Sequence, residues 1–283
     1  MSNQINPNLS PFEKQVLFDK ATEAPFSGEY DKHFEDGIYT CKNCGNLLYY
    51  SRDKFNSGCG WPAFDDEAVD SVAKIADKDG RRIEIICNYC QSHLGHVFAG
   101  EKLTQKNIRH CVNSTSLDFI EAKKLETVIV GAGCFWGVEH WFKKLNGILS
   151  AVSGYSGGSL ENPSYEQICT GKTGHLEVVE ILFNKDKLDL EKVLKYFFEI
   201  HNFEQQNGQG PDLGEQYESV IFYQNEEQKQ VAENLIQKLV KMNYQPATKI
   251  LSAKSFYPAE NYHQNYYQKT GKKPYCHSYK QIF

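Results

Sequence analysis

The pattern of hydrophobic and polar positions changes about two fifths of the way along the chain. In the first part, short strand-like runs stand between turns, as in GIYTC, NLLYYS, IEIIC and the stretch around HVF. One short helix is predicted from Pro11 to about Lys20, because Ser10 and Glu13 fit an N-cap and a capping box, with proline at the first helical position. The best interpretation of this part is a mainly β domain built from antiparallel sheets.

Strand and helix patterns alternate in the second part. Strands are predicted at ILSAVSGYS, HLEVVEILF and SVIFY, and amphipathic helices at LDLEKVLKYFFEIH and NEEQKQVAENLIQKLVKM. This alternation predicts an α+β two-layer sandwich. We expect an N-terminal domain over residues 1–122, a short polar linker at 123–126 and a C-terminal domain over 127–283.

A predicted strand, a glycine turn and a predicted helix meet at Cys134. The β-branched run Val128–Val130 precedes the turn, and apolar residues recur at helical spacing after it. Cys134 is therefore expected at or near the first turn of the helix, where unpaired N–H groups favour an anion and make the thiolate easier to form. The aromatic pair Phe135 and Trp136 beside it would suit a small apolar group. The alternative is a buried, inert cysteine in a tight turn.

Composition narrows the function classes. The chain has 283 residues, 40% hydrophobic and 24% charged, which is ordinary for a globular protein of about two domains. A net charge of −5 without a basic run weighs against nucleic acid, and no apolar stretch is long enough to span a membrane. Because the N-terminal residues lack an export-signal pattern, we expect a cytoplasmic protein, and we expect it to be a monomer.

Nine cysteines in such a chain indicate metal binding or redox chemistry before structural disulfides. Cys41 and Cys44 (CKNC) form one CxxC pair, and Cys87 and Cys90 (CNYC) form another, with 42 residues between the two pairs. Four thiolates make a closed tetrahedral zinc site, which would stabilise the domain by closing a long loop. We therefore expect one structural zinc ion per chain. The alternatives are four unrelated thiols or two local disulfides.

Three further motifs gather polar and reactive residues in the first part. They are SGCGWPAF with Cys59 and Trp61, HLGH with His93 and His96, and RHCVNS with Arg109, Cys111 and Asn113. Strand alternation would turn the last three residues to one face, where an arginine favours a thiolate and an asparagine can orient it. Each motif alone has an ordinary structural explanation. Together they indicate a site.

In this order, the motifs PFSGEY, CKNCG, GCGWPAF, HLGHVF and RHCVNSTSL resemble the methionine sulfoxide reductase B family over roughly residues 8–122. The resemblance implies a domain specific for the R epimer, with zinc on the CxxC cysteines and Trp61 packed against the substrate methyl. It implies Cys111 as nucleophile and Cys59 as resolving cysteine. The groups that bind the sulfoxide oxygen and handle protons would be His93, His96, Arg109 and Asn113. The chain departs from the family at Gly100, where an acidic residue is common, and Glu101 is the candidate to replace it.

Polar residues of the second part also gather in or near loops. These residues are Tyr165, Glu177, Asp212 and Tyr217. A half-buried glutamate would have a raised pKa and could donate a proton near neutrality, although Glu177 could instead be solvated on the outer face of its strand. Cys276 lies in a turn-rich polar tail that could bring a second thiol to Cys134. Cys169 is predicted to be a packed small hydrophobe.

The motifs GCFWGVE, NPSYEQICTG, TGHLEVVE, GPDLGEQYESVIFY and AENYHQNYY resemble the methionine sulfoxide reductase A family over about residues 127–280. The resemblance implies specificity for the S epimer, with Cys134 as nucleophile and Cys276 as resolving cysteine. The methyl cage would be Phe135 and Trp136. Tyr165, Glu177 and Tyr217 would bind and protonate the oxygen, with Asp212 orienting. Glu215 and Glu218 replace residues that are commonly threonine or proline and arginine, which could alter the preferred peptide charge.

Both resemblances together predict a bifunctional enzyme that repairs methionine sulfoxide in proteins. A thiolate attacks the sulfur while the oxygen is protonated, which leaves a sulfenic acid that a second cysteine converts to a disulfide. Thioredoxin is the reductant that the family resemblance implies. One competing interpretation is a zinc-ribbon module fused to a thiol-based redox sensor, which does not explain the aromatic residues beside two nucleophiles. Another is a thiol peroxidase.

Overall fold

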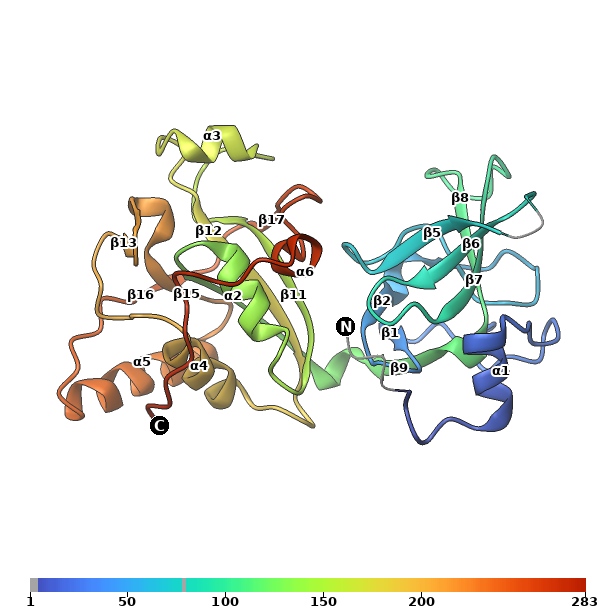
Figure 1. Cartoon of the computed structure of the whole chain (residues 1–283), viewed down its shortest axis with the longest axis horizontal. Helices are drawn as coiled ribbons and strands as arrows, with labels where there is room; N and C mark the ends of the chain where they lie inside the picture. Colours follow the sequence, from blue (N-terminus) through green and yellow to red (C-terminus); the bar gives the residue numbers. More distant parts are fainter. Residues whose placement is uncertain (1–4, 78–79) are drawn as a thin grey trace. The chain divides into compact units, whose positions relative to one another are not determined.

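The computed structural model describes residues 5–77 and 80–283, and the chain divides into two compact units between Leu125 and Glu126 (Figure 1). We call them the N-terminal unit and the C-terminal unit. The stretch expected to be a linker holds the last residues of a 3₁₀ turn, η3 (Ala122–Lys124), and the first residues of strand β10 (Leu125–Ala132).

The N-terminal unit begins with helix α1 (Pro11–Asp19). Ser10 caps it, since the Ser10 hydroxyl accepts from the Glu13 N–H and the Glu13 carboxylate accepts from the Ser10 N–H, as the sequence predicts. Two antiparallel sheets follow, one of three strands in the order β2-β1-β9 and one of six in the order β3-β4-β8-β7-β6-β5. The elements are β1 (Gly37–Cys41), β2 (Leu47–Tyr50), η1 (Ser51–Asp53), β3 (Lys54–Phe55), β4 (Ala63–Phe64), β5 (Val72–Ala76), β6 (Ile83–Cys87), β7 (His93–Ala99), β8 (Ile108–Val112), η2 (Ser114–Ser116) and β9 (Leu117–Glu121).

Aromatic residues of several strands fill the core of this unit. Tyr49 stacks on Phe64 with ring centroids 4.2 Å apart, and the Tyr39 ring packs edge-on against Phe64 at 5.1 Å. Cys41 and Cys87 belong to the same core, so one cysteine of each CxxC pair is fixed by packing.

Gly95 allows strands β7 and β8 to approach closely. A Cβ atom at Gly95, whose φ is +154°, would lie 2.0 Å from the carbonyl oxygen of Cys111. The antiparallel register that results places His96 directly opposite Cys111. Residues directly opposite in such a pair have side chains on the same face of the sheet, so the fold brings an imidazole to the cysteine.

The C-terminal unit is built on a six-stranded sheet with the order β16-β15-β10-β12-β11-β17. Its elements are α2 (Phe135–Phe142), β11 (Ile148–Ser156), α3 (Tyr165–Cys169), β12 (Leu176–Asn184), α4 (Leu190–Glu199), β13 (Gly208–Gln209), β14 (Asp212–Leu213), η4 (Glu215–Tyr217), β15 (Ser219–Tyr223), α5 (Glu226–Lys241), β16 (Lys249–Ser252), β17 (Tyr257–Pro258) and α6 (Tyr266–Thr270). Strand β16 joins β15 in parallel, while the β10–β15 and β11–β12 pairs are antiparallel.

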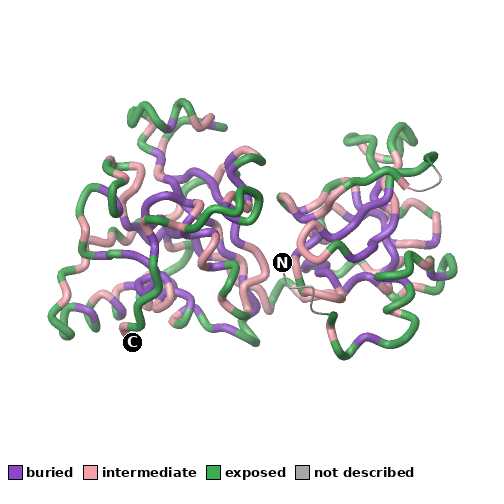
Figure 2. The backbone as a smooth tube through the Cα atoms, in the orientation of Figure 1, coloured by how far each residue is buried: buried purple, intermediate pink, exposed green. Residues whose placement is uncertain are grey.

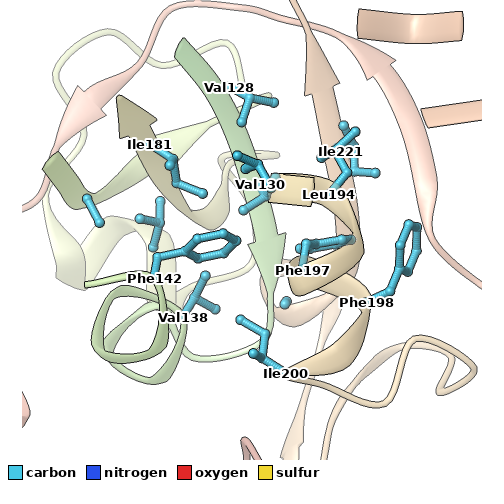
Figure 3. Packing of buried hydrophobic residues seen from close by; sticks show 14 of the residues in the cluster. Val128, Val130, Val138, Phe142, Ile181, Leu194, Phe197, Phe198, Ile200 and Ile221 are labelled. Carbon is cyan, nitrogen blue, oxygen red and sulfur yellow. The ribbon is translucent and has the colours of Figure 1, made fainter. Parts of the chain in front are cut away.

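Alternation along the strands divides this sheet into two buried faces. Val128 and Val130 of β10 lie in the large core with α2, α4 and α5, and Figure 3 shows them beside Val138 and Phe142 of α2. Ile129 turns to the other face, into a smaller cluster. Burial is concentrated on the strands of both units and on the inner sides of the helices (Figure 2).

These features confirm the predicted fold class of a β-rich N-terminal domain and an α+β C-terminal domain. Within the described residues, no helix combines the length and the apolar character that crossing a bilayer requires.

Candidate active sites

Cys134 lies at the N-cap of α2, directly after β10, as the sequence predicts. The turn that places it is tight: Gly133 has φ +88°, and a Cβ atom there would lie 2.4 Å from the Cβ of Gln209. The Cys134 residue is 6% exposed.

The prediction that the Cys134 thiol ionises easily is wrong for this structure. A hydrogen bond with the Cys276 thiol, followed by burial, raises the pKa of the Cys134 thiol. The Trp136 N–H does lower this pKa, which is the expected helix-terminus effect, but the two raising causes outweigh it. The Cys134 thiol therefore keeps its proton in this arrangement.

Glu177 is the buried acid of the C-terminal unit. It is 2% exposed, so the alternative of a solvated residue on an outer strand face is wrong. Its Oε2 accepts a hydrogen bond from the Phe135 N–H at 3.1 Å, which ties strand β12 to the first turn of α2. Burial raises the pKa of Glu177 well above its usual range, and negative charge on Cys134 and on Asp212 raises it further. A thiolate on Cys134 therefore strengthens the hold of Glu177 on its proton.

Tyr165 and Tyr217 lie close enough to Glu177 for its charge to shift their pKa values. Tyr165 is the first residue of α3 and Tyr217 the last of η4, so short elements bring both to the sheet. Burial and then the Glu177 charge raise the pKa of Tyr217 to about 12, and the same two causes raise that of Tyr165. Both hydroxyls thus stay protonated and can donate hydrogen bonds to an oxygen.

Asp212 has a different partner from those expected. Both of its carboxylate oxygens accept from the Tyr275 hydroxyl at 3.1 Å. Its negative charge also contributes to the raised pKa of Glu177 and of Tyr217. The Asp212 carboxylate therefore affects Glu177 and Tyr217 electrostatically. It anchors the C-terminal tail through its hydrogen bonds with Tyr275.

The aromatic pair after Cys134 is fixed by residues that the sequence analysis did not assign. Phe135 is 1% exposed, whereas Trp136 is half-buried and stacks on Tyr266 at 3.7 Å with nearly parallel rings. The Trp136 indole N–H donates to Nδ1 of His263 at 3.0 Å. The density of aromatic residues in AENYHQNYY was the available signal.

Glu260 is a second residue that the sequence analysis missed. Its Oε1 accepts from the Tyr165 N–H and its Oε2 from the buried Tyr155 hydroxyl, both at 3.0 Å. One carboxylate therefore joins the start of α3 to strand β11 and positions Tyr165.

The two remaining cysteines of this unit differ in their surroundings. Cys276 lies in an irregular segment after α6, is half-buried and contacts Cys134. Cys169 is exposed, so its prediction as a packed hydrophobe is wrong. Helix α3 has only five residues, and its buried residue is Ile168, which is 1% exposed. The adjacent Cys169 is therefore left at the surface. The Cys169 thiol hydrogen bonds with Tyr165.

In the N-terminal unit the structure brings Cys59 and Cys111 together, with their Sγ atoms 3.8 Å apart. Cys111 is on β8, and Cys59 is in the glycine-rich loop, where its sulfur accepts from the Ser57 hydroxyl at 3.0 Å. The hydrogen bond from Cys111 lowers the pKa of Cys59 to about 5, and the same contact raises that of Cys111. The pair thus loses a first proton easily and a second one reluctantly, and Arg109 lowers the pKa of both thiols.

The two histidines of this unit are held by carboxylates. Nδ1 of His93, a buried residue, lies 2.7 Å from Glu84, and Nε2 of His96 lies 3.0 Å from Asp77. The two rings are 5.6 Å apart between centroids. Burial lowers the pKa of His93, and the Glu84 carboxylate opposes that shift. Nε2 of His93 is buried and has no hydrogen-bond partner among the described residues.

Arg109 forms a two-pronged ion pair with Glu101, at 2.7 and 2.8 Å, and its guanidinium stacks over Phe98. Glu101, the residue after Gly100, therefore supplies the carboxylate that binds Arg109. The other predicted residues contact backbone: the Trp61 indole donates to the Glu23 carbonyl, and Asn113 bonds the Glu23 N–H and the Leu94 carbonyl. Strand β8 ends one residue before Asn113, so strand alternation does not extend to it.

The four CxxC cysteines converge as the sequence predicts. Their Sγ atoms all lie within 4.8 Å of one another, with Cys41 and Cys90 3.6 Å apart and Cys44 and Cys87 3.7 Å apart. Zinc–sulfur bonds of about 2.3 Å in a tetrahedron require sulfurs roughly 3.8 Å apart, so the cluster fits such an ion. In the part of the chain that the structure describes, this is the one His, Cys, Asp or Glu group arranged to hold a metal.

Comparison with known proteins finds relatives for both units. The family model for peptide methionine sulfoxide reductase matches residues 126–282, and the SelR domain model matches residues 9–121. The chain is 46% identical over 148 residues to the peptide methionine sulfoxide reductase MsrA of Nautilia profundicola, which covers 52% of this chain and 86% of that protein. It is 45% identical over 152 residues to MsrA of Thermus thermophilus, covering 53% of this chain and 86% of that protein.

A solved structure resembles the same part of the chain. Mxr1 from Saccharomyces cerevisiae, in its reduced form, aligns with a TM-score of 0.53 and 33% identity, over 56% of this chain and 94% of that one. The chain therefore belongs to the peptide methionine sulfoxide reductase family. Within it, the chain has the bifunctional arrangement in which a B-type domain precedes an A-type domain.

Proposed function

We propose that each unit reduces one epimer of methionine sulfoxide in oxidised proteins, the R epimer at the N-terminal unit and the S epimer at the C-terminal unit. The observation that carries the proposal is that each unit places two thiols in contact beside groups that can give a proton. Such a pair can take the sulfoxide oxygen as a sulfenic acid and then close to a disulfide.

In the C-terminal unit the Cys134 sulfur attacks the sulfoxide sulfur, and the proton lost by its thiol replaces the one that Glu177 donates. The neutral Glu177 carboxyl gives its proton to the leaving oxygen, which the Tyr165 and Tyr217 hydroxyls hold by hydrogen bonds. The partly exposed Trp136 ring is suited to pack against the substrate methyl. Methionine leaves, and the Cys134 sulfenic acid condenses with Cys276.

In the N-terminal unit Cys111 is the nucleophile and Cys59 the resolving cysteine, with Trp61 as the methyl contact. His93 and His96 bind and protonate the oxygen, and hydrogen bonds to Glu84 and Asp77 hold their rings in place. Arg109 stabilises the thiolate of the pair. Asn113 fixes the end of β8 through its backbone hydrogen bonds.

The CxxC cluster would hold one structural zinc ion on Cys41, Cys44, Cys87 and Cys90. Four protein sulfurs leave no open coordination position, so the ion would stabilise the fold and take no part in the reaction. Turnover needs an external dithiol, since the four CxxC cysteines are assigned to the metal. Thioredoxin is the proposed donor, which fits a monomer in the reducing cytoplasm.

Separated epimers of a methionine sulfoxide peptide test the proposal. With thioredoxin, thioredoxin reductase and NADPH, Cys134→Ser should abolish reduction of the S epimer and spare the R epimer, and Cys111→Ser should do the reverse. Loss of both activities in either variant would contradict two independent sites. Fewer than two turnovers per chain would favour a redox sensor, and faster consumption of peroxide than of sulfoxide would favour a thiol peroxidase.

A further inference from the structure

His277 lies next to the sulfur that closes the disulfide in the C-terminal unit. Its Nδ1 is 3.0 Å from the Cys276 Sγ, and its Nε2 is 2.7 Å from the Ala132 carbonyl oxygen at the end of β10. The ring is 5% exposed and lies over α2, where a Cβ atom at Gly137 would be 2.1 Å from Nδ1. The missing side chain at Gly137 thus provides the space for the imidazole.

These contacts fix which ring nitrogen carries the proton. A carbonyl oxygen can only accept, so Nε2 donates its proton to Ala132. In a neutral imidazole Nδ1 is then an unprotonated acceptor, directed at the Cys276 thiol.

The surroundings keep the imidazole neutral. Burial lowers the pKa of His277 to about 4, while the Ala132 carbonyl and the Asp212 carboxylate oppose that shift. His201 interacts with His277 electrostatically and is itself buried, with a pKa lowered to about 3 by burial. The N-terminal end of α2, which carries the positive end of the helix dipole, also disfavours a positive charge here. At neutral pH the acceptor is available.

We propose that His277 is the proton acceptor for Cys276 in the step that closes the disulfide, an inference that rests on the proposed function. The Cys276 sulfur uses its electron pair to form the S–S bond with the sulfur of the Cys134 sulfenic acid, and its proton passes to Nδ1 of His277. The S–O bond breaks, its electron pair leaves with the oxygen, and the hydroxide takes up a proton to form water. One S–H is lost and one O–H is gained, so the step is balanced without another oxidant.

A single-turnover experiment without reductant separates this step from the first one. The full-length protein is mixed with the S epimer of N-acetylmethionine sulfoxide, and methionine release is followed beside closure of the disulfide by quenched-flow mass spectrometry. His277→Phe, which fills the space without a nitrogen, should release methionine as the wild type does and close the disulfide roughly 10- to 100-fold more slowly. The sulfenic acid should accumulate and react with dimedone. Lowering the pH through about 4 should slow closure in the wild type, as His277 is protonated.

Two more variants separate proton transfer from positioning. His277→Asn keeps an acceptor near the Nδ1 position but no base, and should be as slow as His277→Phe. Gly137→Ala should reproduce the slow closure with His277 intact, because the added methyl displaces the ring.

The outcomes are distinct. Disulfide closure at the wild-type rate in His277→Phe, or full rescue by His277→Asn, would overturn the inference. Loss of methionine release in both His277 variants would overturn it as well, by assigning the ring a structural role. Failure of the wild type to release methionine would instead contradict the proposed function.

Discussion

The two thiol sites meet the same chemical demand with opposite physical means. In the C-terminal unit a carboxyl group is kept neutral by burial, since Glu177 is 2% exposed and accepts a hydrogen bond from the Phe135 N–H. In the N-terminal unit carboxylates, Glu84 and Asp77, hold the imidazoles. Burial keeps the Glu177 carboxyl neutral, whereas hydrogen bonds to carboxylates hold the two imidazoles of the N-terminal unit in place.

The cores that surround the two sites also differ in composition. Around the C-terminal site, the large core of β10, β12, α2 and α4 excludes water (Figure 3). The N-terminal core includes the buried cysteines of the metal cluster. The comparison teaches that the C-terminal site depends on apolar packing, whereas the N-terminal site depends on a cysteine cluster that could hold a metal and on ion pairs.

Loss of the metal cluster should have the largest effect. Cys87→Ser should unfold the N-terminal unit and abolish reduction of the R epimer, because structural zinc sites contribute about 10–16 kcal/mol, comparable with the whole stability of a domain. Reduction of the S epimer should persist. Epimer-resolved assays, circular dichroism and metal analysis check this, and Cys169→Ser is the matched control for metal content. A Cys87→Ser protein with full R activity would show that the cluster has no structural role.

Removing the buried acid should have the next largest effect. Glu177→Gln should slow reduction of the S epimer roughly 10²- to 10⁴-fold and leave the R epimer unaffected. Because the folded-state pKa of Glu177 is raised, the wild-type S activity should fall as pH rises through that pKa, and the variant should lack this step. Rates measured from pH 5 to 9 check it, with exposed Glu161→Gln as the control.

Glu177→Gln should also change how the stability of the protein depends on pH. Between the unfolded pKa of a glutamate, about 4.3, and the raised folded value, the folded state binds more protons than the unfolded state. The wild-type free energy of unfolding therefore falls as pH rises through this window, and Glu177→Gln should remove that fall. Equal urea midpoints for variant and wild type at pH 8 would contradict the raised pKa.

Breaking the ion pair of the N-terminal site should have the smallest effect. Glu101→Gln removes the carboxylate that Arg109 binds, but the Glu101 side chain is 38% exposed, so the pair is screened by solvent. We expect a change in R-epimer activity of roughly 2- to 5-fold and a loss of stability below about 1 kcal/mol. Steady-state assays and urea unfolding check both, with exposed Glu29→Gln as the control. A hundredfold loss of R activity would mean that Glu101 acts in the chemistry itself.

Local features of the sequence predicted most of the fold. The capping box at Ser10, the N-cap position of Cys134 and the strand runs depend on neighbouring residues or on short periodicities, so they can be recognised without tertiary information. The CxxC spacing likewise predicted the cluster of four sulfurs. Strand alternation failed at Asn113, because strand β8 ends before it, and the expected burial of Cys169 failed at the end of the short helix α3.

By itself, the sequence determined which reactive groups are present, the class of fold and the cysteines that converge on a metal site. Only the tertiary structure decided their protonation. Burial by residues distant in the sequence raises the pKa of Glu177, contact with Cys276 raises that of Cys134, and Gly137 leaves space for His277. The reason is that solvation and the charges within a few ångströms set a pKa, and both are fixed when distant segments pack together.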